Sequence, residues 1–174
     1  MTEFDQRLSA SIESAKAKLA EKEEAKRAAE AAKQQQAQAL AENFAAVKSR
    51  AMRFNNNHLE PLFRKAQQEV NQAGFHFVGN YINDEEEGGG RVGSTLESGE
   101  SCFVMAAIDY SLERSTALVE AQTRSGPCFT KSHDFDENTS LEWFQTNVAD
   151  ALGKLLETGE VPTANLVRYG GRVG

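Results

Sequence analysis

The hydrophobic positions of residues 1–54 follow the period of an α-helix. The chain contains no glycine or proline between residues 2 and 54, and alanine, glutamate, lysine, glutamine and leucine fill most positions. These residues favour a helix because they lose little conformational freedom in it. The pattern predicts one long N-terminal helix over residues 1–54, which we call the stalk, with the apolar spacing typical of a coiled coil. The apolar residues at steps of three and four are Leu8, Ile12, Ala15 and Leu19, and then Leu40, Phe44, Val47, Ala51 and Phe54.

Such a helix is too long for a small domain to cover. At a rise of 1.5 Å per residue, some fifty residues extend about 75 Å. Each large apolar side chain of the second group would cost about 1.5–3 kcal/mol if it stayed in water. We therefore expect the stalk to pack against a second copy of the chain in a homo-oligomer, or against another helical protein. The expected partner-binding residues are Leu40, Phe44, Val47, Ala51 and Phe54.

Residues 55–73 predict a kink followed by a second helix. The three asparagines at 55–57 have low helix propensity, and Pro61 follows them. An apolar face then continues to residue 73. Gly74 is suited to the left-handed conformation that often ends a helix. We expect this second helix to connect the stalk to the rest of the chain.

From residue 74 onward, a region that we call the head, the hydrophobic period changes from 3.6 to 2. This alternation predicts strands over residues 75–83, 102–110, 116–123 and 128–133. The strand at 102–110 is apolar on both faces, which is typical of a central strand covered from both sides. Thr139 and Glu142 have the spacing of a capping box, and the helix that they open carries an apolar stripe to about residue 157. The predicted fold class is α+β: a long coiled-coil-like N-terminal helix, then a small antiparallel β-sheet covered by a C-terminal helix.

Two parts of the head, which spans residues 74–174, have weaker patterns. Residues 84–100 contain four consecutive acidic residues and several glycines, so we expect an acidic flexible loop or the tip of an extended hairpin. Near the end of the chain, Leu166, Val167 and Tyr169 have the pattern of a short edge strand.

The head and the stalk differ in charge. Residues 75–174 carry seven Lys and Arg against sixteen Asp and Glu, whereas residues 1–54 carry ten against eight. Nucleic-acid binding relies on cations that release counterions from phosphates, so the acidic head is a poor surface for it. The alternative function is that of a nucleic-acid accessory protein that binds through the stalk, but interleaved glutamates cancel most of the positive field there. The residues that would serve it are Arg7, Lys16, Lys18, Lys22, Lys26, Arg27, Lys48, Arg50 and Arg53.

The chain has no complete catalytic or metal-binding motif. Residues 88–95 have the outline of a phosphate loop but lack its lysine and precede no helix. Asp134 and Asp136 match the start of a calcium loop, but Thr139 stands where its glycine should be. Cys102 and Cys128 lie inside apolar strand patterns, so we expect buried thiols. We predict no catalytic residue, no metal and no cofactor, while a small enzyme with an unrecognised site stays a third hypothesis.

The sequence also bears on the cellular location of the protein. No stretch is apolar enough to cross a bilayer, and residues 1–20 lack the apolar centre of a secretory signal. We therefore expect a cytoplasmic protein without a membrane partner. The sequence favours a non-enzymatic structural or adaptor protein, which oligomerises or docks through its stalk and binds a further protein through its acidic head.

Overall fold

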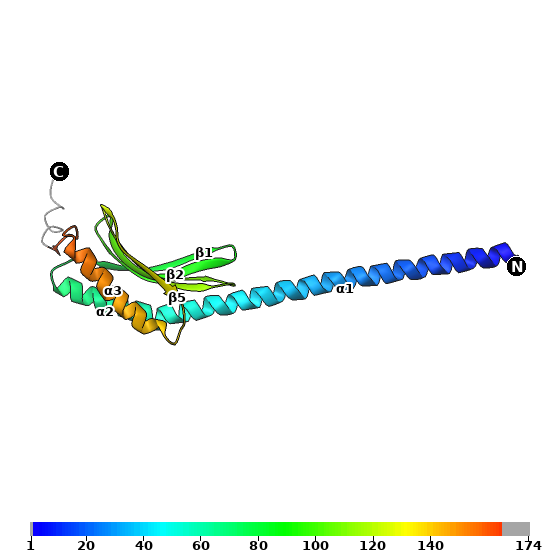
Figure 1. Cartoon of the computed structure of the whole chain (residues 1–174), viewed down its shortest axis with the longest axis horizontal. Coiled ribbons are helices and arrows are strands. Elements are labelled where there is room, and N and C mark those ends of the chain that lie inside the picture. The colour runs from blue at the N-terminus through cyan, green and yellow to red at the C-terminus, as the bar shows by residue number, and fades with distance from the viewer. Residues whose placement is uncertain (1, 165–174) are drawn as a thin grey trace. The chain divides into compact units, whose positions relative to one another are not determined.

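The computed structural model describes residues 2–164 and has an α+β fold (Figure 1). It comprises two compact units, residues up to 42 and residues from 43 onward. The predicted fold class is confirmed, because an N-terminal helix precedes an antiparallel sheet of five strands and a C-terminal helix packs on that sheet. The elements are α1 (Glu3–Phe54), a π-helical turn (Asn55–Leu59), α2 (Glu60–Gln72), β1 (Val78–Glu86), β2 (Gly89–Ser98), β3 (Cys102–Ser111), β4 (Ser115–Thr123), β5 (Gly126–Asp134) and α3 (Ser140–Glu157).

Helix α1 begins with a cap formed by Thr2 and Asp5. The Thr2 hydroxyl and amide donate to the Asp5 carboxylate over 2.6 and 2.9 Å, and the Asp5 amide donates to the Thr2 hydroxyl over 3.3 Å. These hydrogen bonds lower the pKa of Asp5, which keeps a negative charge beside the free amides of the helix N-terminus. Every described residue up to residue 42 is exposed.

The chain stays helical through the three asparagines, so a short loop does not form there, while the kink stays a prediction. Asn55–Leu59 form one π-helical turn, in which the Glu60 amide donates to the Asn55 carbonyl, and α2 follows directly. The side chain of Asn55 is buried and accepts a hydrogen bond from the Ser94 hydroxyl over 3.1 Å. This hydrogen bond offsets the low helix propensity of asparagine. Pro61 has no amide hydrogen to donate, and the wider π-helical turn accommodates that loss.

Helix α2 ends as the sequence predicts. Gly74 has a φ of +97°, a conformation that residues with a side chain rarely adopt. The amide of Phe75 donates to the carbonyl of Val70 over 3.1 Å, which satisfies one of the last free carbonyls of the helix.

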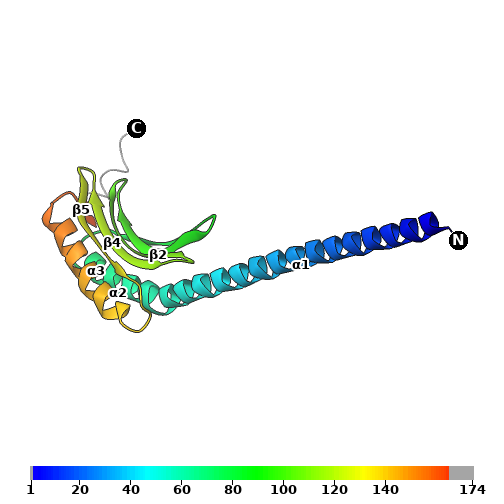
Figure 2. The same ribbon diagram turned by 45° about the vertical axis from the view of Figure 1, so that its right-hand side comes forward.

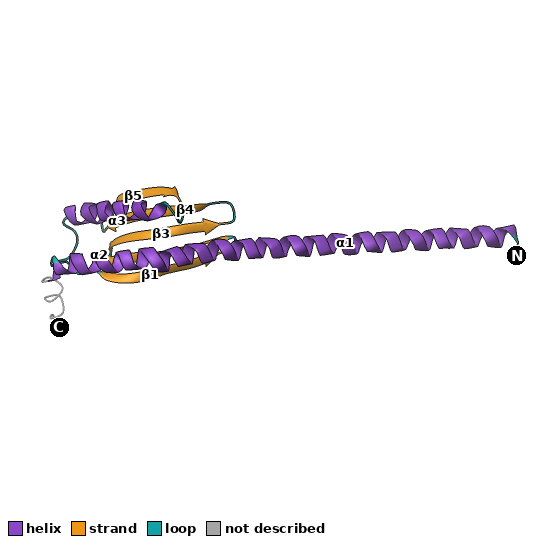
Figure 3. Cartoon of the chain, turned by 90° about the horizontal axis from the view of Figure 1, so that it is seen from below, coloured by secondary structure: helices purple, strands orange, loops and turns teal. Residues whose placement is uncertain are grey.

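The five strands form one antiparallel sheet in the order of the sequence, β1-β2-β3-β4-β5. Figure 3 labels β1, β3, β4 and β5 across this sheet. The predicted central position of β3 is confirmed. The first strand begins at Val78, three residues later than expected, because Phe77 is held in the preceding segment. The Phe77 carbonyl accepts hydrogen bonds from the side chains of Gln67 and Asn71 over 3.0 and 3.1 Å.

Of the two alternatives for residues 84–100, the flexible loop is wrong, whereas an extended hairpin does form there. Residues 84–86 are the last three of β1, and most of residues 87–100 belong to β2. Strand β2 pairs with β1 on one side and with β3 on the other. The strand is rich in glycine, serine and threonine, so it lacks the apolar alternation by which strands are recognised. Its buried hydroxyls are nevertheless satisfied: Ser94 donates to Asn55, Thr95 to the Val104 carbonyl and Ser98 to the His76 carbonyl.

The hydrophobic core lies between one face of the sheet and the helices. Helix α2 contacts β1 and β2, whereas α3 contacts β3, β4 and β5 (Figures 1 and 3). The α3 stripe is confirmed, but Thr139 makes no capping hydrogen bond; instead the Ser140 hydroxyl accepts from the Asp136 amide over 2.9 Å. The core includes Val92, Leu96, Val104, Ile108 and Val119 from the sheet and Phe144, Val148, Ala151 and Leu155 from α3.

The opposite face of the sheet is open. No helix of residues 43–164 covers it, so the prediction that β3 is covered from both sides is wrong. Figure 2 shows that the sheet is strongly curved and that the open face is the concave one. Ala107 and Met105 of β3 are still buried on this face, because the neighbouring side chains of the curved sheet close over them. The edge strand expected at Leu166, Val167 and Tyr169 lies outside the described residues.

Candidate interaction surfaces

The structure places four of the five expected partner-binding residues against the chain itself. Ala51 and Phe54 belong to the core, and the Phe54 ring lies 5.0 Å from Phe135. Phe44 and Val47 are half-buried and pack against the same core. In place of the partner helix that we expected, the head covers these four residues, because the helical stripe that they form faces inward after residue 43.

Leu40 alone of the five is exposed, and it belongs to a second group of apolar side chains. Phe4, Leu8, Ile12, Leu19 and Leu40 are all between 47% and 71% exposed. Their spacings of four, four, seven and twenty-one residues keep them near one stripe of a helix with a heptad repeat. We call these five residues the exposed stripe. Leu8, Ile12 and Leu19 belong to the first apolar group of the sequence analysis, whereas Phe4 was missed there.

Two basic residues of the stalk make ion pairs with the head. Lys48 binds Glu85 of β1, and this hydrogen bond raises the pKa of Lys48. Arg50 lies 4.0 Å from Glu137. Both pairs involve partly exposed side chains, so each contributes little to stability. These two ion pairs nevertheless involve two of the nine basic residues through which the stalk would bind nucleic acid.

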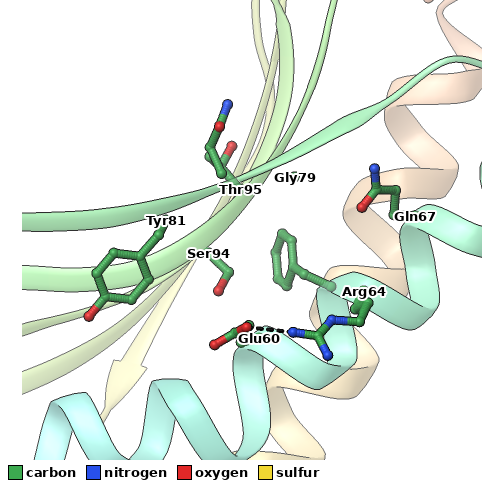
Figure 4. Close-up of a pocket in the computed structure, with 9 residues that line it drawn as sticks. Glu60, Arg64, Gln67, Gly79, Tyr81, Ser94 and Thr95 are labelled. Carbon is green, nitrogen blue, oxygen red and sulfur yellow. Dashed lines mark hydrogen bonds and ion pairs between the residues drawn. The ribbon is translucent and has the colours of Figure 1, made fainter.

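A cleft of about 410 Å³ lies between α2 and the first two strands (Figure 4). Glu60 and Arg64 form an ion pair over 2.6 Å along its α2 side, and Tyr81 stands on the β1 side. Burial, together with the charge of Glu60, raises the pKa of Tyr81. The charged groups of this cleft pair with each other, and the Gln67 amide donates to a backbone carbonyl. We therefore interpret the cleft as the place where α2 packs against the sheet, with its charged groups already paired.

Tyr110 is the last residue but one of the central strand, β3. Its ring lies 5.9 Å from the ring of Phe44, and burial raises its pKa. The ring crosses Gly90 of β2, where an added Cβ would come within 2.6 Å of the Tyr110 Cζ atom. Gly90 thus leaves the space that this aromatic side chain fills, a pairing that compensates for glycine in a strand.

The open face of the sheet carries most of its charge in one row across the strands. Register aligns Asp84, Arg91, Asp109, Thr116 and Asp134 in that order. The Arg91 guanidinium donates to both carboxylate oxygens of Asp109, over 2.5 and 2.9 Å. These bonds raise the pKa of Arg91, as do the neighbouring charges of Glu120 and Asp84. Glu97 and Glu120 lie in the rows that follow, so this face is acidic.

Neither cysteine forms a disulfide. Cys102 is buried, and its thiol lies 3.7 Å from the Glu160 carbonyl; Cys128 is half-buried, with its thiol 3.5 Å from the Ala121 carbonyl. Burial raises the pKa of Cys128. A higher pKa lowers the fraction of reactive thiolate at a given pH. This surrounding is that of a structural thiol.

We expect Cys128 to react slowly with iodoacetamide, with a rate that rises at a higher pH than for a free cysteine, whose pKa is about 8.5. The Cys102→Ala variant isolates this reaction, which mass spectrometry follows over pH. The same variant in urea supplies the free-thiol rate as the control. A native rate that already levels off at or below the pH of the unfolded control would contradict the burial of this thiol.

Residues 2–164 contain no group of three or more histidine, cysteine, aspartate or glutamate side chains placed to hold a metal ion. No helix among them is long and apolar enough to span a membrane. No protein-family model, no curated protein and no solved structure matches this chain.

Proposed function

We propose that this protein is a non-enzymatic assembly or adaptor protein. In this proposal residues 3–42 of α1 form a coiled coil with a second copy of the chain or with another helical protein, and the acidic head binds a further protein. The exposed stripe supports the proposed coiled coil, because five large apolar side chains lie in water along one helix. Burying each of them in a partner interface would gain about 1.5–3 kcal/mol.

The fold supports a contact nearer the N-terminus than the sequence pattern suggests. Phe44, Val47 and Phe54 are packed against the head, so the contact shifts toward Leu8, Ile12 and Leu19. Between Leu19 and Leu40 the heptad positions hold Lys22, Lys26 and Lys33. A charged position in a seam costs stability but selects register and partner. The partner therefore presents acidic or alanine-rich positions opposite this section.

Light scattering coupled to size exclusion tests the proposal on the full chain. We expect a mass above that of the monomer at micromolar concentration. Truncating Leu8 or Leu19 to alanine should weaken association by about 2–4 kcal/mol, by analogy with packed interiors. Alanine keeps the helix propensity, so the substitution removes only the apolar contact.

Glu24→Ala is the matched control. Glu24 lies on the same helix, on the side opposite the exposed stripe, so its removal should leave the mass unchanged. A wild-type monomer whose mass also stays unchanged after mixing with candidate helical partners argues against the stalk as a contact. Equal effects of Leu8→Ala and Glu24→Ala would show that association does not depend on the exposed stripe.

A further inference from the structure

The open face of the sheet has an apolar centre that the core does not explain. Met105 and Ala107 are buried there, yet they do not belong to the core on the helix side of the sheet. Ile82, Phe103 and Leu118 lie around them and are half-buried. An open sheet face that meets only water is usually polar. Apolar side chains enclosed by a charged rim are instead typical of a protein interface.

The rim of this face has one dominant sign of charge. Strand alternation and register place six carboxylates on it and, among residues 78–134 of the five strands, the single cation Arg91. Asp109 already holds the guanidinium of Arg91 through both of its oxygens. Arg114, from the turn between β3 and β4, also forms an ion pair with Asp134. The carboxylates of the other four residues are left to attract a cation from outside. The six are Asp84, Glu86, Glu97, Asp109, Glu120 and Asp134.

A cavity lies at one end of the open face, beside some of these carboxylates. It has a volume of about 350 Å³ and is lined by Asp84, Glu86, Gly90, Arg91 and Asp109. Two carboxylates of its wall, those of Asp84 and Glu86, are exposed. The space suits the end of a lysine or arginine side chain, which would bind carboxylates through charge-assisted hydrogen bonds.

We propose that the concave open face of the sheet binds a segment of another protein in which lysine or arginine side chains alternate with apolar ones. This inference rests on the proposed function, since it takes the head as a protein-binding module and assigns the surface. The apolar side chains cover Met105 and Leu118, and the cations meet the carboxylates of the rim. Nucleic acid is repelled by the same charges, and a second copy of this face would meet like charges.

The three methionines allow a direct test on the full chain. Met105 lies on the open face, whereas Met52 packs against the core on the helix side. With methyl-labelled methionine, a short peptide of alternating lysine and leucine should shift the Met105 signal and leave Met52 unchanged. A peptide of alternating glutamate and leucine should shift neither. Absence of a Met105 shift with the lysine peptide, or an equal shift with the glutamate peptide, overturns the proposal.

Charge reversals identify the surface. Glu97→Lys and Glu120→Lys on the open face should each weaken peptide binding about tenfold, since a reversal costs on the order of 1.4 kcal/mol for a partner of opposite charge. Glu142→Lys and Asp150→Lys make the same change in net charge on exposed positions of α3, and they should change affinity little. An equal loss from both pairs means that binding follows net charge alone, which overturns the proposal.

Two further readouts separate this inference from competing occupants and from the proposed function. A Met105 shift caused by a single-stranded oligonucleotide, or by dilution of the protein alone, would assign the face to nucleic acid or to a second copy and overturn the proposal. The mass from light scattering reports stalk association independently. A failed peptide test with an intact oligomer therefore removes this inference only, whereas a positive test with a monomer supports the face while the stalk contact fails.

Discussion

Replacing Phe54 with alanine is expected to lower the free energy of unfolding by about 3–5 kcal/mol, because it removes a large ring from a packed interior. Phe54 is 3% exposed, and its ring lies 5.0 Å from Phe135 and 5.8 Å from Phe144. Urea unfolding measures the change. The fluorescence of Trp143, the only tryptophan, reports it, since its ring lies 5.2 Å from that of Phe144.

Phe4→Ala is the matched control on the same helix. Phe4 is 71% exposed, so its loss should change the stability of the head by no more than about 0.5 kcal/mol. If Phe54→Ala does not fold, Phe54→Leu keeps most of the apolar volume and should cost roughly 1.5 kcal/mol. A Phe54 variant that retains the wild-type unfolding midpoint but loses oligomeric mass would instead make this residue a partner contact, as the sequence pattern alone suggests.

The second large effect is expected for Gly93→Ala in β2. A Cβ at residue 93 would come within 2.7 Å of the Ala107 Cα atom and 2.8 Å of its Cβ atom, and would also press on the Ala106 carbonyl. Backbone atoms of a central strand cannot move aside as the end of a flexible side chain can. We expect a loss of roughly 1–3 kcal/mol in the free energy of unfolding, as for other overpacked interiors.

Gly153→Ala should change stability in the opposite direction. Gly153 is an exposed residue in the interior of α3, and an added Cβ would meet no atom within 4 Å. Alanine there should stabilise the protein by about 0.5–1 kcal/mol, because glycine loses more conformational freedom in a helix. Urea unfolding of both variants measures the two effects. Two glycines that responded alike would show that β3 does not approach β2 as closely at residue 93 as the structure has it.

Local features of the sequence were sufficient for several elements. The composition of the stalk predicted α1, Gly74 predicted the end of α2, and the apolar residues on both faces of β3 predicted a central strand. The stripe of α3 was equally readable, from Phe144 to Leu155. These features depend on conformational preferences within a few residues, and such preferences are written in the sequence itself.

Strand β2 could not be predicted from its local sequence. Its glycines, serines and threonines indicate a loop, but pairing on both sides makes it a strand. Gly93 is required by its distance from Ala107, and the Ser94 hydroxyl finds its acceptor in Asn55, thirty-nine residues away. The same hydrogen bond holds Asn55 inside a continuous helix. Neither of these partners can be recognised from the residues next to it.

The sequence by itself determined that this protein has a long helix with two groups of apolar side chains and an acidic α+β head. Only the tertiary structure decided which group is covered, since Phe54 lies in the core while Leu8 and Leu19 are exposed. It also decided that one face of the sheet is open and that acidic side chains gather there. The physical reason is that a periodic pattern shows which side chains need burial, whereas the surface that buries them is set by contacts between residues distant in the chain.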